Sequence, residues 1–322
     1  MSELPFPVDP EIEALAPAER APVDPRPRSL PSRLWRQREF TSGVIIVGIM
    51  VVLALAAPLF AAITGHGPDA QFPNTGLTPD GIPVGPNSSF WLGTDASGRD
   101  IFVRTLYGAR VSLLVGVPAT TIAMIIGTTV GLFAGYFGGL VDRVLSQIID
   151  VVLSFPFVVT ALSLVTLNRS SSGGSIVSPV LLVIIVISAF AWTYFARLAR
   201  GLTQDIRSRP FVEAARTLGA SNRRIIFREI LPLVAPSVAV YWAVQLPQNM
   251  VAEATMSFLG IGILPPNPSL GNIISDAQST NLYTVQPWYL LAPAIALFLL
   301  VLGFNAVSGG IRNVLDPNGP GR

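Results

Sequence analysis

The chain has 322 residues, of which 51% are hydrophobic and only 12% are charged, and its mean hydropathy is +0.57. Soluble globular proteins carry about 25% charged residues, so this composition excludes an ordinary soluble domain and indicates a membrane protein. The formal net charge is only +2, and we expect no nucleic acid among the partners.

Missing and scarce residue types exclude several kinds of site. The chain has no Cys and a single His, His66, which lies between glycines and is expected to be a structural bystander. Thiolate metal sites and most zinc or nucleophile–base arrangements are thereby excluded. The chain also lacks Lys, which a P-loop needs to hold phosphates. We therefore predict no catalytic residue, metal or cofactor in this chain, and another chain must hydrolyse any ATP that is used.

The N-terminal part divides into a tail, a membrane span and a loop. Residues 1–42 are rich in Pro and polar side chains, which predicts a disordered tail. Residues 43–64 contain no charge and are long enough to cross a hydrocarbon core about 30 Å thick. This run is too long and begins too late for a cleavable signal peptide. Residues 65–110 are then predicted to form an extracytoplasmic loop.

The end of that loop carries two pairs of opposite charges at i,i+4 spacing. These pairs, Asp95 with Arg99 and Asp100 with Arg104, predict an amphipathic helix over 95–110 on the outer membrane surface. Such a helix would either anchor the next span or contact a partner on the outer side.

Five further apolar stretches meet the length criterion for a membrane helix. The sequence thus predicts an all-α membrane protein with six transmembrane helices. Residues 111–317 would hold a five-helix core with a loop at 197–231, followed by a short tail at 318–322. The five stretches are 111–137, 144–167, 176–196, 232–257 and 288–311.

The second predicted span is rich in small residues. Its segment "GTTVG", residues 127–131, has the Gly-x-x-x-Gly spacing that allows two helices to approach closely. Alternatively, these glycines reflect only the general frequency of Gly in membrane helices.

The distribution of Arg predicts the orientation of the six spans. If the N-terminus is cytoplasmic, 17 Arg lie on the inside and 4 lie on the outside. Cytoplasmic loops are enriched in positive charge, so we expect a multi-pass plasma membrane protein with both termini in the cytoplasm.

An Arg-rich stretch at residues 209–232 then lies in the cytoplasm. Apolar residues recur there with helical period at Phe211, Ala214, Ala215 and Leu218. Pro210 suits the first turn of that helix and Gly219 suits the positive φ that ends it, while Ser221 or Asn222 would cap a second helix. A stripe of Ile226, Ile230 and Leu233 is predicted on the second helix.

Two interpretations of this helical pair compete. The Arg side chains favour a hairpin on anionic lipid headgroups. Paired alanines on the contact face favour a rigid knob that docks closely on a soluble protein, because helices on membrane surfaces prefer large apolar residues.

The same stretch resembles the EAA motif of bacterial ABC importer permeases. The matching elements are Glu213-Ala214-Ala215, Gly219 and Leu231-Pro232, while Glu229 stands where the family usually has Ile. The resemblance implies coupling helices seated on an ATPase subunit, with docking residues Phe211, Glu213, Ala214, Ala215, Leu218 and Gly219.

Further stretches resemble the C-type permease subunit of dipeptide, oligopeptide and nickel importers. They are "WLGTDASGRDIFVRTLYGARVSLLVG" (91–116), "SFLGIGILPPNPSLGNIISDA" (257–277) and "FNAVSGGIRNVLDP" (304–317). The resemblance implies the fold of type I ABC importer permeases and, as partners, a homologous permease, two ATP-binding subunits, an extracytoplasmic substrate-binding protein and membrane lipid. ATP and Mg would be bound by the ATPase subunits.

Two acidic residues in or near the spans are candidates for the translocation path, because charge in hydrocarbon is costly unless paired or hydrated. They are Glu253, near the outer face, and Asp150. Glu253 would receive the amino group of a peptide or make an interhelical hydrogen bond, and Asp150 would line the path or pair with a neighbouring helix. Prolines at 247, 265, 266 and 268 predict a break late in the fifth span and a folded outer loop over 260–286.

Two other classes of function stay open at this stage. An ion-coupled secondary transporter would use Asp150 or Glu253 as its ion site. A membrane scaffold would have no transport role.

Overall fold

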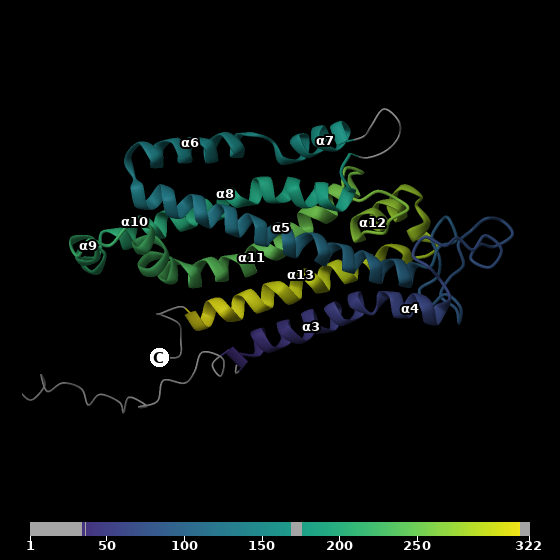
Figure 1. Cartoon of the computed structure of the whole chain (residues 1–322). Coiled ribbons are helices and arrows are strands. Elements are labelled where there is room, and N and C mark those ends of the chain that lie inside the picture. Colours follow the sequence, from purple (N-terminus) through teal and green to yellow (C-terminus); the bar gives the residue numbers. More distant parts are fainter. Residues whose placement is uncertain (1–33, 36, 169–175, 316–322) are drawn as a thin grey trace, which may run out of the picture.

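The computed structural model describes residues 34–35, 37–168 and 176–315, and within these ranges the chain forms helices and no β-strand. The long helices lie side by side in an elongated bundle (Figure 1). Most of the predicted tail lies outside the described residues. The helices are α3 (Arg38–Leu55), α4 (Ala57–Thr64), α5 (Ile101–Phe137), α6 (Gly139–Ser154), α7 (Phe157–Asn168), α8 (Pro179–Arg207), α9 (Pro210–Thr217), α10 (Asn222–Arg224), α11 (Leu231–Phe258), α12 (Leu270–Ser279) and α13 (Trp288–Leu315), with a π-helical turn at Ile225–Ile230 and a 3-10 turn at Leu282–Thr284.

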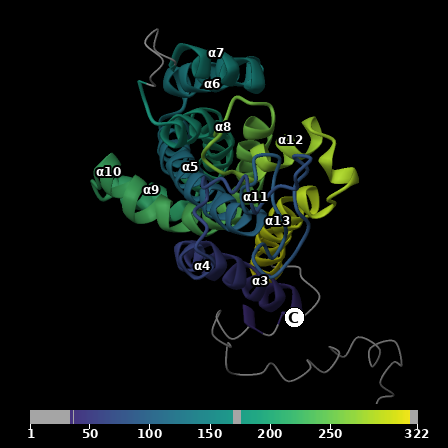
Figure 2. The same cartoon turned by 90° about the vertical axis from the view of Figure 1, so that its right-hand side faces the viewer.

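Five helices of the described chain are long and apolar enough to cross a membrane, and the bent pair of α6 and α7 brings the number to six. Viewed along the bundle, α6 and α7 lie on one side and α3 and α4 on the opposite side (Figure 2). The predicted number of spans is confirmed if the bent pair counts as one. Their bounds differ, because α3 begins at Arg38 inside the predicted tail and α8 continues to Arg207, through about the first third of the predicted loop.

The third predicted span, 144–167, is wrong as a single straight helix. α6 and α7 meet at an angle of 81°. The break lies at Phe155, whose backbone is extended and which precedes Pro156. A proline disfavours helical conformation in the residue before it, so Pro156 explains the bend.

The predicted amphipathic helix over 95–110 is also wrong. Residues 95–100 form a loop in which Asp95, Arg99 and Asp100 are buried, and α5 begins only at Ile101 and continues for 37 residues. The Asp100 side chain accepts hydrogen bonds from the backbone N–H groups of Phe102 and Val103. Asp100 is therefore the N-cap of α5, and residues 101–110 belong to the spanning helix rather than to a surface helix.

The centre of the bundle is the close packing of α5 on α8. A Cβ atom on Gly131 would lie 2.5 Å from the Ala196 carbonyl oxygen, and one on Gly135 would lie 2.6 Å from the Thr203 Cβ. Gly127 backs onto α8 in the same way. The prediction that the "GTTVG" segment brings two helices together is confirmed, since these positions have no room for a side chain.

The outer loop over 260–286 is folded, as predicted. It contains α12, whose N-terminus has a capping box between Ser269 and Asn272. Pro247, however, does not break the fifth span, because α11 continues through it to Phe258. Membrane helices tolerate proline where neighbouring groups satisfy the freed backbone carbonyl.

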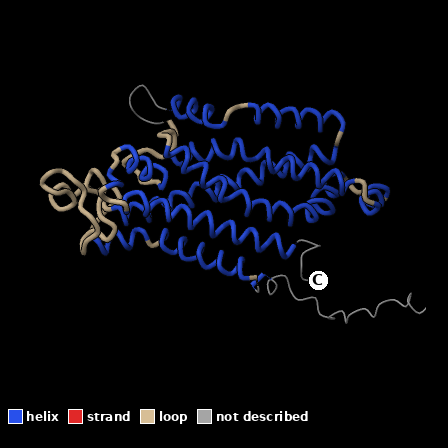
Figure 3. The backbone as a smooth tube through the Cα atoms, turned by 180° about the vertical axis from the view of Figure 1, so that it is seen from behind, coloured by secondary structure: helices blue, strands red, loops and turns tan. Residues whose placement is uncertain are grey.

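The two ends of the bundle differ in character. Loops gather at one end, where residues 65–100 and the α12 segment lie, whereas the other end carries only short connections (Figure 3). α3 begins, α13 ends and α9 lies at this second end (Figure 1). The helical pair predicted at residues 209–232 is therefore at the same end of the bundle as the start of α3 and the end of α13.

Candidate functional site: the loop between α8 and α11

The candidate site is the docking loop, which we define as residues 208–230 between α8 and α11. Its local conformation follows the sequence prediction. Pro210 stands at the start of α9, Gly219 has φ of +82° just after the helix, and the Ser221 hydroxyl accepts a hydrogen bond from the Arg224 N–H at 3.4 Å. The positive φ favours a glycine, so Gly219 suits the turn between α9 and α10.

The predicted docking residues lie mostly on the solvent side of this loop. Leu218 is 88% exposed and Phe211 is 40% exposed. Glu213, Ala214 and Gly219 are exposed as well, while Ala215 is half-buried and packs against the apolar core. Leu218 and Phe211 thus present apolar area to whatever lies beyond the end of the bundle, which is a feature of interaction surfaces.

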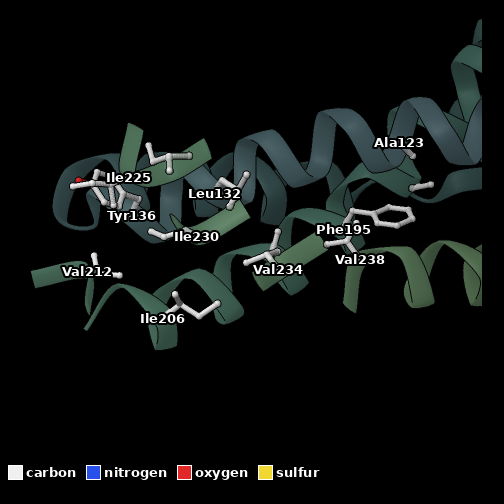
Figure 4. Packing of buried hydrophobic residues seen from close by; sticks show 13 residues of the cluster. Ala123, Leu132, Tyr136, Phe195, Ile206, Val212, Ile225, Ile230, Val234 and Val238 are labelled. Carbon is white, nitrogen blue, oxygen red and sulfur yellow. The ribbon is translucent and has the colours of Figure 1, made fainter. Parts of the chain in front are cut away.

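Val212 of α9 is a buried residue that lies outside the apolar face predicted from the sequence. Its side chain is 0% exposed, whereas its neighbours on either side are exposed. It belongs to a core cluster that includes Ile206 of α8, Leu132 and Tyr136 of α5, and Ile225, Ile226 and Ile230 of the π-turn (Figure 4). This deeply buried valine packs the short helix α9 against α8 and the π-turn, within the same apolar cluster as the end of α5.

Polar contacts hold the loop to the end of α5. The Tyr136 hydroxyl donates to the Asn222 Oδ1 at 2.8 Å, and just before the loop the Arg207 guanidinium, at the end of α8, donates to the Gly135 carbonyl oxygen at 2.9 Å. The Arg216 guanidinium lies over the Tyr136 ring, 5.8 Å from its centroid. Asn222 was predicted as a possible cap, but it contacts Tyr136 and leaves the cap to Ser221.

The second predicted stripe is right at Ile226 and Ile230 but wrong at Leu233, which is 49% exposed. Val234 is buried in its place. The reason is the π-helical turn at Ile225–Ile230, which has more residues per turn than an α-helix and shifts the buried face by one position. The docking loop therefore joins α11 without a flexible break.

The two acidic candidates for a translocation path lie far apart in the fold. Glu253 of α11 is buried and accepts hydrogen bonds from Ser112 of α5 at 2.8 Å and from Ser257 at 2.9 Å. Asp150 of α6 pairs with Arg197 of α8 at 2.7 Å, and both side chains are more than half exposed. The expected interhelical contacts are confirmed for both residues. A role in translocation stays a prediction.

A buried polar cluster lies at the opposite, loop-rich end. His66 lies 2.7 Å from Asp100 and stacks on Phe90, so it fixes the end of α4 against the cap of α5 and is structural, as expected. The predicted pair of Asp95 and Arg99 is present at 2.6 Å. Asp100 and Arg104 do not pair, because Asp100 is occupied as the helix cap and Arg104 lies 3.4 Å from Asp95 instead.

Comparison with known proteins shows relatives along most of the chain. It is 34% identical over 284 residues to the glutathione transport system permease protein GsiD of Pectobacterium atrosepticum, covering 88% of this chain and 89% of the relative. It is 35% identical over 285 residues to the oligopeptide transport system permease protein OppC of Haemophilus influenzae, covering 88% and 86%. The GsiD protein of Escherichia coli O157:H7 is 35% identical over 284 residues, covering 88% and 89%.

Among solved structures, inward-facing conformations of the MetNI methionine ABC transporter have a chain of the same fold, with a TM-score of 0.50 and 20% identity, covering 65% of this chain and 96% of that one. Residues 127–318, which include the docking loop, match the family described as binding-protein-dependent transport system inner membrane component. The chain therefore belongs to this family of inner membrane transport permeases, as the EAA resemblance implied.

Proposed function

We propose that this chain is the C-type permease subunit of an ATP-driven importer of peptides or a related small solute. The relatives named for glutathione and for oligopeptides support a peptide-like substrate. Both termini would be cytoplasmic, which is supported by the 17 to 4 distribution of Arg and by the position of α9 at the same end of the bundle as the start of α3 and the end of α13.

One observation carries the proposal. The side chains of Phe211 and Leu218 are exposed on α9 and at its C-terminal end, whereas Val212 of the same helix is buried in the apolar core of the bundle. A mobile helix on a lipid surface would need no such attachment, whereas a helix that transmits force from a partner does.

The proposed mechanism couples this helix to the spans. Two ATP-binding subunits would hold ATP and Mg, and their closure would move α9 as a lever. Because the docking loop continues into α11 through the π-turn and is bonded to α5 through Tyr136, movement of α9 shifts both helices. The spans would then pass from an outward to an inward opening, a population shift driven by the nucleotide state of the partner. A homologous permease and an extracytoplasmic substrate-binding protein would complete the assembly, and Glu253 and Asp150 would lie along the path.

Reconstitution in proteoliposomes tests this function against the secondary transporter. Uptake of peptide should require ATP, the ATPase subunits and the binding protein together. Uptake by this chain alone under a proton gradient would contradict the proposal and favour an ion site at Asp150 or Glu253. The pairing of Asp150 with Arg197 and the two hydroxyl donors to Glu253 already favour fixed structural contacts over a freely titrating ion site.

A further inference from the structure

An apolar groove lies between α5 and α11, next to the docking loop, and no part of the function described above uses it. Its volume is about 350 Å³. The lining is apolar except for two threonines of α5. The residues that line it are Met124, Ile125, Thr128, Thr129 and Leu132 of α5, and Phe227, Leu231, Ala235, Val238 and Ala239 of the π-turn and α11.

The height of the groove in the membrane follows from the packing of α5 on α8. Gly131, beside the lower end of the groove, backs onto Ala196. Residues 179–196 of α8 carry no charge, and Arg197 is the first charged residue after them. In the orientation proposed above, the end of the groove near Leu132 and Phe227 therefore lies where the hydrocarbon of the cytoplasmic leaflet begins.

The length of the groove matches one leaflet. From Phe227 to Ala239 the helix rises about 18 Å at 1.5 Å per residue. Half of a hydrocarbon core of about 30 Å is about 15 Å. At its upper end, the Trp242 indole N–H donates to the Thr121 hydroxyl at 3.2 Å and joins the two helices. The groove is thus open over the depth of the cytoplasmic leaflet and closed near the middle of the membrane.

Two positively charged side chains lie near the end of the groove that is formed by Phe227. Arg224 and Arg228 are exposed, and they lie on either side of Phe227 in the chain, which lines this end of the groove. Among the described residues, neither has a carboxylate within salt-bridge distance. The neighbouring Glu229 is half-buried, whereas Arg228 is exposed.

A polar atom inside the groove lacks a partner. The buried Thr128 hydroxyl makes no hydrogen bond in the described structure. In contrast, Thr129 and Thr121 donate to carbonyl oxygens of their own helix, at 2.7 Å and 2.8 Å. A buried hydroxyl without a partner is costly, but this oxygen has almost no accessible surface, so a molecule in the groove would reach it only after a change of the Thr128 rotamer.

We propose that this groove binds an anionic phospholipid of the cytoplasmic leaflet, with one acyl chain between α5 and α11 and the phosphate at Arg224 and Arg228. Basic pockets between membrane helices on the cytoplasmic side are suited to anionic headgroups. The lipid would contact the π-turn at Phe227 and Leu231, and so it would support the joint between the docking loop and α11.

Native mass spectrometry of the purified full chain tests the proposal. After delipidation, the chain is supplied with phosphatidylglycerol or with phosphatidylcholine. We expect at least tenfold preferential retention of phosphatidylglycerol. Ala235→Trp, which fills the groove, and the double change Arg224→Gln with Arg228→Gln should each abolish this preference. Matched controls are Leu233→Trp, on an exposed part of α11 outside the groove, and Arg312→Gln, near the end of α13. Equal retention by Ala235→Trp and the wild type, or an equal loss in Arg312→Gln, would overturn the proposal.

A second measurement does not depend on groove-filling variants. A photo-crosslinking amino acid at Ala239, in the complete complex in membranes, should form an adduct with phospholipid. An adduct with another membrane chain instead would show that a partner helix fills the groove, and would overturn the proposal. Either result leaves the proposed transport function standing, because uptake is measured separately.

Discussion

The attachment of α9 by Val212 makes a quantitative prediction about coupling. Val212→Ala removes two methyl groups from a side chain that is 0% exposed. At about 0.8 kcal/mol for each buried methyl, the transfer free energy lost is about 1.6 kcal/mol. The cavity left behind raises the cost to about 2–3 kcal/mol. Because α9 has no other buried residue, most of this cost falls on the contact between α9 and the bundle.

A loss of about 2 kcal/mol changes an equilibrium roughly 30-fold. Forms in which α9 is detached from the bundle should therefore become more common, and ATP hydrolysis in those forms would not drive peptide uptake. In the reconstituted complex, we expect ATP hydrolysis to continue while peptide uptake per ATP falls several-fold. The chain has no Cys, so a spin label on Leu218→Cys reports the motion of α9 directly and should show greater mobility when Val212→Ala is added.

Val285→Ala is the matched control, because it removes the same two methyl groups from a valine that is 59% exposed, at the loop-rich end. It should leave both uptake per ATP and label mobility unchanged. If Val212→Ala leaves both quantities at the wild-type value, then the buried valine does not hold α9 and the lever mechanism is wrong.

Three further predictions concern the turn, the helix packing and the buried acid. Gly219→Val forces a β-branched residue into positive φ, at a cost of about 1–2 kcal/mol, and should reduce uptake per ATP with normal membrane insertion, whereas Gly219→Asn should retain most coupling. Gly131→Val places atoms against the Ala196 carbonyl, so thermal unfolding in detergent should occur at least several degrees lower, while Gly201→Val, at a position with open space, should change it little. Glu253→Gln keeps a carbonyl oxygen for the Ser112 or Ser257 hydroxyl and should retain folding and uptake, whereas loss of uptake with normal folding would indicate that the carboxylate acts in translocation.

The sequence predicts those parts of the fold that depend on local composition and spacing. Uncharged runs locate the spans, and the proline and glycine around α9 locate its ends. The glycines of α5 predict a close helix contact, although the sequence cannot tell that the partner is α8, since this depends on tertiary packing.

The errors arise where one residue has two possible roles. Asp100 has the spacing of a surface ion pair with Arg104, yet it caps α5, and a cap satisfies backbone N–H groups that would otherwise be unpaired. Pro247 lies inside a helix while Pro156 separates two, because the surroundings decide whether the freed backbone finds partners. The π-turn could not be predicted from the periodicity of Ile226 and Ile230, which fits an α-helix equally well.

The local conformation of the docking loop was predicted in outline, but its attachment to the bundle was not. Periodicity identified the exposed face of Phe211 and Leu218, whereas Val212 has no sequence signal that separates it from an exposed neighbour. The departure at Glu229 leaves the buried face intact, because Ile230 fills the core beside it and Glu229 is half-buried at its edge.

Crosslinking from Leu218 can show whether α9 docks on an ATPase subunit. In the complete complex, a photo-crosslinking residue at Leu218, which is 88% exposed, should form its main adduct with an ATP-binding subunit. The same residue at Leu259, which is 50% exposed at the opposite end of α11, should form none with that subunit. Adducts from Leu218 with lipid alone would show instead that the helical pair lies on the membrane surface and does not dock on the ATPase subunit.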